Sequence, residues 1–593
     1  MSRGAFSESR GQLLLGLVAG ALLALVGRLC HIHAVLSRED GQLAQHMRRQ
    51  QRATIPIPAR RGEIRDVANR VLAGSHECPS IFADPSLIQD PGRVGKLVGS
   101  VIGMQPEALE KLLRDAASEG RQFVWLSRRT HPSREKAIDE LDLAGIGVIY
   151  EPRRYYPMGT VGAHVVGFVN IDEEGLEGIE RQYDRILKGV PGSRTIYRDA
   201  GYRPIGPAEG EDTYIAPRDG MSVKLTIDAV VQEILDDQVA AAVKQFKAAS
   251  GVGIIMNPRT GDVLAMTSYP GYDPNDPGSA TDDARRNRVL RDPCEPGSTF
   301  KPFAASAALA EGVVRRGEII NCHGGLYAVG SRRLHDHHPY GDLTFEQIVA
   351  KSSNIGMALL GERLGNERLH RYLRAFGFGA RTGIELPRED VGILLPLRQW
   401  TSFSTTSLPM GQEVAVTPLQ LATAFCAIVN GGKLVRPRVV RAIVDPCGEV
   451  VEEFTQPQVV RQVIPPDVAE YMTKTVLVAV VNEGTGTKAQ LDEYQVLGKT
   501  GTAQIARKGG GGFEPGKYTS SFIGAAPASN PAVVVLIMIR EPRGVGYYGG
   551  TVAAPPVREV LRRTLAYLQV PPDKVADEAW RAGAIGSRAT ARR

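Results

Sequence analysis

An uninterrupted apolar run at residues 13–27 constrains this chain more than any other feature, because so long an apolar surface is stable only out of water. Arg3 and Arg10 precede the run, and Arg28 follows it. With its flanking residues the segment is just long enough to span a bilayer. We therefore predict a transmembrane anchor at residues 11–33.

A cleaved signal peptide is the alternative interpretation of the same segment. Ala19-Gly20-Ala21 offers a cleavage site made of small residues. The apolar run continues past these alanines, which favours the anchor. Arginines on both sides do not orient the segment, but long downstream domains cross the membrane regardless of such charges. Both interpretations predict that the rest of the chain is exported.

Composition narrows the classes of function. The chain has 593 residues, which suggests two to four domains, and its 71 basic residues nearly balance its 65 acidic ones. No block of like charges is long enough to form a nucleic-acid-binding tail, so we predict no nucleic-acid partner. The six cysteines are scattered and include no C-x-x-C pair. A disulfide framework is therefore not expected, although an isolated bridge remains open.

The exported part divides at a linker. Residues 202–219 are rich in Gly, Pro, Asp and Glu, which is typical of a linker or surface loop. From about residue 61 to this linker, short strand-like runs mix with charged helical segments. We find no Ser/His/Asp or metal-ligand cluster there, as expected of a scaffold. The chain after residue 571 is predicted to be disordered.

After the linker, strand-like and helical segments alternate in blocks. The predicted strands lie at residues 223–227, 253–256, 263–266, 494–497, 521–525 and 533–539. The predicted helices lie at residues 230–246 and 554–568, with a helical block between about 299 and 478. Strand pairs, an inserted helical block and returning strands predict a mixed α/β layer architecture.

Ser298 stands at the start of a predicted helix. The turn dipeptide Pro296-Gly297 precedes it, and residues 299–310 form an apolar, Ala-rich run. Free backbone N–H groups at a helix N-terminus favour a developing negative charge. Lys301 lies one turn further on the same face, and a hydroxyl beside an amine can act as nucleophile and base. The S-x-x-K pattern alone is weak, because a second match begins at Ser133.

Two further motifs follow Ser298 in order. Ser352-Ser353-Asn354 opens a helical segment, and Lys499-Thr500-Gly501-Thr502 follows a strand-like run. Ser-Ser-Asn by itself is more often a helix cap, and Lys-Thr-Gly by itself is more often a strand end. S-x-x-K, S-x-N and K-T-G together, in this order and at domain-scale separation, are the motif set of the penicillin-recognising serine acyltransferases.

With these motifs the chain resembles a class B penicillin-binding protein from about residue 61 to residue 559. Further stretches carry the resemblance: Arg61-Gly62-Glu63-Ile64-Arg65-Asp66, Arg154-Tyr155-Tyr156-Pro157-Met158-Gly159, Gly175-Leu176-Glu177-Gly178-Ile179-Glu180 and Val416-Thr417-Pro418-Leu419-Gln420. Tyr547-Tyr548-Gly549-Gly550 and the flanks of Ser298 and Ser352 favour the cell-division subgroup. Val67 and Asn69 replace the Arg and Gly usual after the first of these stretches, which puts the local turn geometry in question.

The resemblance implies a multidomain α/β protein. It would combine a penicillin-binding transpeptidase fold, with a central antiparallel sheet between helices, an elongated α+β pedestal and one N-terminal transmembrane helix. The expected domains are the cytoplasmic segment at residues 1–10, the anchor at 11–33, a dimerisation-type pedestal at 34–219, a transpeptidase domain at 220–568 and a disordered tail at 569–593.

The resemblance also implies roles for the motif residues. Ser298 would attack the carbonyl of the penultimate D-alanine of a peptidoglycan stem peptide and release the terminal D-alanine. Lys301 would take the serine proton, which requires a neutral amine, and we expect burial beside Lys499 to lower its pKa. Ser352 would relay a proton to the leaving amine. Asn354 would orient Lys301 and bind the substrate amide.

The K-T-G strand would hold the substrate. Lys499, Thr500 and Thr502 would bind the substrate carboxylate, and Gly501 would let the strand approach closely. Backbone N–H groups of Ser298 and Thr502 would form an oxyanion hole. An amine from a neighbouring peptidoglycan strand would then complete the cross-link. No metal and no cofactor is expected.

The expected partners follow from this chemistry. They are the stem peptides that donate and accept the cross-link, β-lactams and the membrane. A division enzyme would also need a glycosyltransferase of the shape, elongation, division and sporulation family, with other division proteins. The expected location is the cytoplasmic (inner) membrane, crossed once, with the catalytic domain on the extracytoplasmic side.

One local cluster admits two interpretations. Zinc-type ligands gather in a short region after Ser298, namely Cys322, His323, His335, Asp336, His337 and His338. We prefer a polar surface loop. The alternative is a structural zinc ion that fixes this loop near the active-site cleft.

Other functions compete with septal cross-linking. An elongation-type transpeptidase shares the fold and the chemistry. A β-lactamase or β-lactam sensor is disfavoured, because no Glu-x-x-Leu-Asn segment lies between Ser352 and Lys499 and only one candidate membrane segment exists. Intact motifs disfavour a non-catalytic division scaffold. A bifunctional enzyme is disfavoured because the N-terminal half has no recognisable glycosyltransferase motif.

Overall fold

The computed structural model describes residues 8–31, 52–198, 204–207, 214–507, 512–544 and 546–574. The chain forms two compact units, Met1–Arg60 with Gly189–Asp219, and Arg61–Lys188 with Gly220–Arg593. Several predicted features fall partly outside the described residues. They include residues 1–7 of the cytoplasmic segment, residues 32–33 of the anchor, residues 34–51 of the pedestal, much of the linker at 202–219, and residues 575–593 of the tail.

The first unit contains helix α1 (Glu8–His31) and a small antiparallel sheet. In this sheet β6 (Gly192–Arg198) pairs with β1 (Arg52–Ile57), β7 (Pro204–Pro207) and β8 (Tyr214–Ile215). The α1 stretch Gly11–His31 has a mean hydropathy of 2.3 and is not buried against other described residues. Its length and composition fit a single membrane pass.

The second unit begins with a mixed sheet that joins distant parts of the chain. Its strand order is β20-β19-β9-β2-β3-β4, and β5 also pairs with β3. The strands are β2 (Ile64–Arg65), β3 (Val71–Ala83), β4 (Val124–Ser127), β5 (Ile146–Tyr155), β9 (Ser222–Leu225), β19 (Val440–Val444) and β20 (Val450–Glu453). The pairing of β9 with both β2 and β19 makes one continuous sheet from segments on either side of the linker.

Three helices cover the part of this sheet formed by β3 and β4. They are α3 (Pro91–Ile102), α4 (Pro106–Ser118) and α5 (Pro132–Asp139). Their buried residues, such as Val98 and Leu109, pack with Ile81 of β3 in one apolar cluster. The second S-x-x-K match lies on α5, where Ser133 and Lys136 are both exposed. Ser133 Oγ lies 2.9 Å from Nδ1 of the exposed His131, but Lys136 stays in solvent, so this match lacks the buried amine that could act as its base.

Three of the stretches that carried the family resemblance meet in a buried ion network. Arg61 Nε donates to Glu180 Oε2 at 2.7 Å, and Arg154 Nε donates to Glu180 Oε1 at 2.6 Å. Arg61 Nη1 also donates to Asp184 at 2.8 Å. Arg61, Arg154 and Glu180 are almost completely buried. Because a buried carboxylate is stable only when paired, these residues depend on one another.

The turn after Asp66 resolves the question raised by Asn69. Asn69 adopts a left-handed backbone conformation with φ of 65°. Its N–H donates to the Asp66 carbonyl at 3.1 Å, and the Arg70 N–H donates to the Asp66 side chain at 2.8 Å. Asparagine tolerates this conformation better than most residues, so it can stand where the resemblance leads us to expect glycine.

A five-stranded antiparallel sheet forms the centre of the remaining part, as predicted. Its order is β11-β10-β24-β23-β22. The strands are β10 (Ser250–Met256), β11 (Val263–Tyr269), β22 (Leu497–Ala506), β23 (Phe513–Ala526) and β24 (Val533–Arg540). The strand predicted at 494–497 is wrong in its bounds, because β22 begins at Leu497 and continues through the polar K-T-G motif. The pattern of apolar residues could not reveal a strand of that composition.

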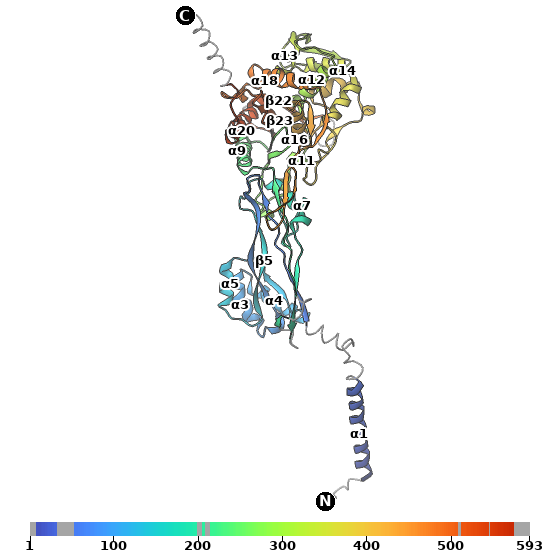
Figure 1. Cartoon of the computed structure of the whole chain (residues 1–593), viewed down its shortest axis with the longest axis vertical. Helices are drawn as coiled ribbons and strands as arrows, with labels where there is room; N and C mark the ends of the chain where they lie inside the picture. The colour runs from blue at the N-terminus through green and yellow to red at the C-terminus, as the bar shows by residue number, and fades with distance from the viewer. Residues whose placement is uncertain are drawn as a thin grey trace. The chain divides into compact units, whose positions relative to one another are not determined.

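Helices cover both faces of this sheet, as Figure 1 shows for α9 (Ala229–Gln245), α16 (Pro418–Val429) and α20 (Ala554–Tyr567). In β24, Val535 and Ile537 pack with α9 and α20, whereas Leu536 and Met538 belong to the cluster that includes α16. Successive side chains point to opposite faces of a strand, so a continuous apolar run buries both faces. Each fully buried aliphatic side chain contributes about 2 kcal/mol.

A helical block and short strands lie between β11 and β22. The helices are α10 (Asp282–Arg285), α11 (Arg288–Arg291), α12 (Lys301–Ala310), α13 (Phe345–Ala350), α14 (Asn354–Ala375), α15 (Ser404–Ser407), α16, α17 (Pro466–Tyr471) and α18 (Leu477–Asn482). The short strands are β12 (Ile319–Asn321), β13 (Leu326–Val329), β14 (Arg332–His335), β15 (Asp342–Thr344), β16 (Ile393–Leu394), β17 (Val414–Ala415), β18 (Lys433–Val435) and β21 (Val459–Gln462). Short helices α6 (Ala163–Val166), α7 (Gly178–Gln182), α8 (Asp184–Leu187) and α19 (Gly549–Val552) complete the α-helices of the described residues.

Candidate active site

Ser298 lies in a single helical turn, Gly297–Phe300, that leads directly into α12. Gly297 has φ of 54°, and a Cβ there would come within 3.2 Å of Ala503 Cβ in β22. The turn therefore packs closely against the strand that carries the K-T-G motif. Ser298 is partly exposed, and within the described part of the chain its hydroxyl has no hydrogen-bond partner. It is open to a substrate.

Lys301 brings the first and second motifs together. Its side chain is fully buried at the start of α12. Its Nζ donates to Asn354 Oδ1 at 2.8 Å, to Ser352 Oγ at 3.1 Å and to the Ser352 carbonyl at 2.6 Å. No carboxylate pairs with this amine among the described residues. A buried amine held only by neutral acceptors is poorly stabilised as an ammonium.

Lys499, in the third motif, also contacts Ser352. Its fully buried Nζ donates to Ser352 Oγ at 3.0 Å and to the Thr500 carbonyl at 3.2 Å. Ser352 itself has φ of 61°, a conformation that non-glycine residues rarely adopt. This strained backbone places one hydroxyl between two lysines that lie 198 positions apart in sequence.

Burial governs the protonation of both amines. It lowers the pKa of Lys301 to about 7, while the nearby charge of Asp336 acts in the opposite direction. Burial also lowers the pKa of Lys499 well below its ordinary value, and repulsion from Lys301 lowers it further. We expected Lys499 to be a main cause of the lowered pKa of Lys301. The causes that act on Lys301 are burial and Asp336, whereas repulsion between the two amines lowers the pKa of Lys499.

A hairpin fixes the start of α14, where the second motif lies. The hairpin is formed by β13 and β14, and Asp336 follows it. Asp336 accepts hydrogen bonds from the Ser353 hydroxyl at 2.6 Å, from the Ile355 N–H at 3.2 Å and from the Asn354 N–H. The Asn354 side chain also donates to the His335 carbonyl at 3.0 Å. A carboxylate at a helix N-terminus is favourable, so Asp336 holds Asn354 in place.

The K-T-G motif lies within β22. The Thr500 hydroxyl lies 2.5 Å from that of Thr485, and the Thr502 hydroxyl accepts from the Gly549 N–H at 3.0 Å. A Cβ at Gly501 would come within 2.8 Å of Thr299 Cγ2 and 3.1 Å of the Pro296 carbonyl. Only glycine therefore lets β22 approach the turn that carries Ser298.

The structure thus brings together residues from all three motifs, and it adds groups that the sequence did not assign to the site. From the sequence, Asp336 is predicted only as a zinc-type ligand. His337 lies close enough that the charge of Lys301 lowers its pKa, although burial is the larger cause. Its ring also packs edge-on against Tyr548 of the Tyr547-Tyr548-Gly549-Gly550 stretch. The sequence holds one signal for this, because Asp336 and His337 both lie in the polar segment before the second motif.

The cysteine and histidine cluster does not converge. In the described residues, no three His, Cys, Asp or Glu side chains lie where they could hold a metal ion together. Cys322 is buried, and its thiol lies 3.6 Å from the Ser353 hydroxyl, whereas His335 is exposed on β14. The segment is therefore a hairpin that supports α14, and the zinc alternative finds no ligand set here.

Two family models match most of the chain. The Penicillin binding protein transpeptidase domain matches residues 251–562, and the Penicillin-binding Protein dimerisation domain matches residues 56–225. The three motifs all fall within the first match, and the buried Arg61–Glu180–Arg154 network falls within the second.

Curated relatives and solved structures are similar over nearly the whole length. Stage V sporulation protein D of Bacillus subtilis is 36% identical over 95% of this chain and 87% of its own length. Peptidoglycan D,D-transpeptidase FtsI of Escherichia coli is 32% identical over 96% of this chain and 93% of its own. The crystal structure of a peptidoglycan synthetase from Bifidobacterium adolescentis is 26% identical, with a TM-score of 0.70 over 88% of this chain and 98% of that one.

Proposed function

Because this chain belongs to the class B penicillin-binding proteins and is a serine D-Ala-D-Ala transpeptidase, we propose that Ser298 is its nucleophile and that Lys301 is the base. The observation that carries this proposal is the environment of Lys301. A fully buried amine with a pKa near 7, one helical turn from an accessible serine, is suited to accept a proton at neutral pH.

In the acylation step, Ser298 Oγ bonds to the carbonyl carbon of the penultimate D-alanine as its proton passes to Lys301 Nζ. The backbone N–H groups of Ser298 and Thr502 stabilise the oxyanion. The C–N bond then breaks, and the leaving D-alanine takes a proton that Ser352 relays from Lys301. The 3.1 Å contact between Lys301 and Ser352 supports this relay. Asn354 keeps the amine oriented throughout.

Lys499 couples substrate binding to this chemistry. The terminal carboxylate of the stem peptide binds beside Lys499, Thr500 and Thr502. A carboxylate at this position raises the proton affinity of Lys499, and the restored ammonium then repels a proton on Lys301. Both lysines contact Ser352 Oγ, which supports such a coupling. Binding of a carboxylate would therefore favour the neutral form of Lys301, which is the form that can accept the serine proton.

The acyl-enzyme has two fates that distinguish related functions. An amine from a neighbouring strand attacks the ester, forms the cross-link and frees Ser298. A β-lactam acylates Ser298 in the same way, but its leaving group stays attached and the adduct persists. Rapid hydrolysis of that adduct would instead characterise a β-lactamase.

Intact-mass spectrometry with benzylpenicillin tests the assignment of Ser298. The wild type should gain the mass of one penicillin, and Ser298→Ala should gain none. Ser133→Ala is the matched control, because it removes the serine of the exposed S-x-x-K match on α5 and should still form the adduct. A persistent adduct on Ser298→Ala, or none on the wild type, would overturn the proposal.

We further propose septal cross-linking at the cytoplasmic membrane, with α1 as the single anchor and the catalytic domain on the extracytoplasmic side. The likeness to the Escherichia coli transpeptidase FtsI and the Tyr547-Tyr548-Gly549-Gly550 stretch support this role. The domains proposed are the anchor at 11–33, the pedestal at 34–219, the transpeptidase domain at 220–568 and a tail at 569–593. A glycosyltransferase of the shape, elongation, division and sporulation family would be the membrane partner.

Localisation separates septal from elongation-type cross-linking. A fluorescent fusion of the full chain, in its native host, should gather at midcell before constriction. Ser298→Ala should still gather there, because the proposed recruitment does not need catalysis. A uniform signal along the lateral wall would favour elongation.

A further inference from the structure

A hollow of about 160 Å³ lies away from Ser298, and none of the residues that line it belongs to the active site. It is bounded by the end of α14 and the loop after it, by α16 and by strands β18 and β21. Four arginines line it, namely Arg374, Arg381, Arg436 and Arg461, and its lining contains no aspartate or glutamate. None of the four forms an ion pair within the described part of the chain.

Two of these arginines are already held in place. Arg436 Nε donates to the Gly383 carbonyl at 2.6 Å, and Arg374 Nη1 donates to the Gly379 carbonyl at 2.8 Å. The loop that supplies these carbonyls is itself fixed, because Gln420 Nε2 donates to the Ala380 carbonyl at 2.7 Å. Each guanidinium keeps other N–H groups unused, since it carries five donors. The positive charge is therefore pre-positioned before any ligand arrives.

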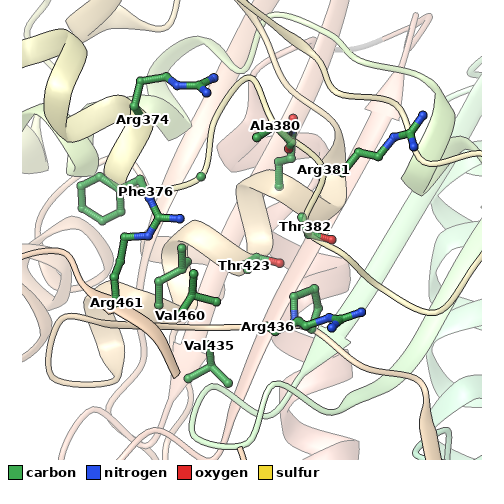
Figure 2. A pocket seen from close by; sticks show the side chains of 14 residues that line it. Arg374, Phe376, Ala380, Arg381, Thr382, Thr423, Val435, Arg436, Val460 and Arg461 are labelled. Carbon is green, nitrogen blue, oxygen red and sulfur yellow. Dashed lines mark hydrogen bonds between the residues drawn. The ribbon is translucent and has the colours of Figure 1, made fainter. Parts of the chain in front are cut away.

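A buried hydroxyl supplies the second, independent observation. Thr423, on α16, is 5% exposed, and its Oγ1 has no hydrogen-bond partner among the described residues. Figure 2 shows Thr423 in the middle of the hollow, with Arg461 on one side and Arg381 and Arg436 on the other. Leaving a buried hydroxyl unpaired costs about 1–3 kcal/mol, so the site is incomplete without an acceptor.

We propose that this hollow, which we call the arginine pocket, binds a phosphate group. Arginine forks match phosphate oxygens in pairs, and a phosphate offers three acceptor oxygens and up to two negative charges. The Thr423 hydroxyl would donate to one of those oxygens. Four unpaired guanidinium groups are more charge than a single carboxylate needs. The volume of the hollow corresponds to roughly five water molecules at about 30 Å³ each. It therefore leaves room for part of the molecule that carries the phosphate.

Calorimetry on the full-length protein in detergent, at constant ionic strength, tests this proposal with three probes. Inorganic pyrophosphate and a glycerol phosphate oligomer should each bind saturably and compete with each other. Tighter binding of pyrophosphate would identify a free diphosphate as the source, and tighter binding of the oligomer would identify a phosphodiester chain. Tighter binding of hexaglutamate than of either, or saturable binding of none, would overturn the proposal.

Matched variants place the binding in the arginine pocket. Arg461→Gln should weaken pyrophosphate binding roughly tenfold, as expected for loss of one charge-assisted hydrogen bond. Arg398→Gln removes an exposed arginine outside the pocket and should leave the affinity unchanged. Equal weakening by both variants would mean a non-specific charge effect and would overturn the proposal.

Thr423→Val gives a sharper test, because the hydroxyl has no partner to lose in the free protein. Its melting temperature should not fall, while its affinity for pyrophosphate should drop roughly fivefold. Thr564→Val is the control, since Thr564 Oγ1 in α20 is also buried and unpartnered among the described residues but lies outside the arginine pocket. Unchanged affinity in Thr423→Val would remove the hydroxyl from the site and refute the assignment.

Discussion

At Ser352, two buried lysines donate to the same hydroxyl oxygen, Lys301 from 3.1 Å and Lys499 from 3.0 Å. Two ammonium groups so close together would repel strongly in a buried site, so the pair favours carrying at most one charge. The lowered pKa values of both lysines follow from burial first. The geometry thus sets the protonation state that the proposed chemistry requires.

The pH dependence of acylation should follow the titration of Lys301. Below its pKa of about 7 the amine is protonated and cannot accept the serine proton, so the acylation rate constant should fall about tenfold per pH unit. Above that pH the rate should level off. Stopped-flow measurements with a fluorescent penicillin between pH 5.5 and 8.5 provide the profile.

His337 is the necessary control for that profile. It lies near Lys301, and its pKa is lowered from an ordinary value of 6.5 by burial and by the charge of Lys301. His337→Gln should keep the inflection near pH 7. If the inflection disappears with the histidine, Lys301 is not the group that titrates.

At the scale of elements, the hairpin β13–β14 and helix α14 act as one support. Asp336 joins them through the Ser353 hydroxyl and two backbone N–H groups. The sequence could reveal Ser352 and Asn354, because their motif is contiguous. It could not reveal Asp336, since a hairpin must fold before that carboxylate reaches a helix start 17 positions away. The Arg61–Glu180–Arg154 network was hidden for the same reason.

Asp336→Asn should change both the rate and the pH profile of acylation. It weakens the hold on Asn354, so the rate should fall roughly tenfold. It also removes a negative charge that raises the pKa of Lys301, so the inflection should move to lower pH. His335→Ala keeps the backbone carbonyl that Asn354 uses and should behave as wild type. An inflection at higher pH would contradict this assignment.

Glu180→Gln tests the buried ion network of the pedestal. The change leaves Arg61 and Arg154 buried without their shared carboxylate, so the free energy of unfolding should fall by about 3 kcal/mol. Asp184→Asn is the matched control, because the Asp184 side chain is 30% exposed and should cost roughly 1 kcal/mol or less. Urea unfolding followed by circular dichroism measures both. Similar losses in the two variants would show that burial does not set the cost.

At the scale of the whole molecule, the functional groups are divided between the two units. Helix α1 belongs to the first unit, and every proposed active-site residue belongs to the second. The sequence could reveal the apolar run and the three short motifs, because these are local signals, whereas the predicted domain bounds remain a prediction. It predicted strand bounds less well, because Lys499 and Gly501 interrupt the apolar pattern of β22 although they lie within its ladder.

A variant without residues 1–33 should separate membrane attachment from catalysis. It should no longer sediment with membranes, because the only membrane-length apolar helix among the described residues is removed. Its acylation rate with penicillin should stay within about twofold of the full chain, since the site residues and their contacts remain. A loss beyond roughly tenfold would place part of the active site's support in the first unit.

Strand β22 is the last strand of its sheet, with β23 as its one neighbour in the described order. An edge strand offers a row of backbone donors and acceptors to an incoming extended chain. A stem peptide aligned there would form a sixth strand, and slipping by one residue would turn every side chain to the other face. The carboxylate-binding end at Lys499 would then fix the position of the peptide along β22. The bond that Ser298 attacks would be set by its distance from the peptide's C-terminal carboxylate, whatever the upstream sequence.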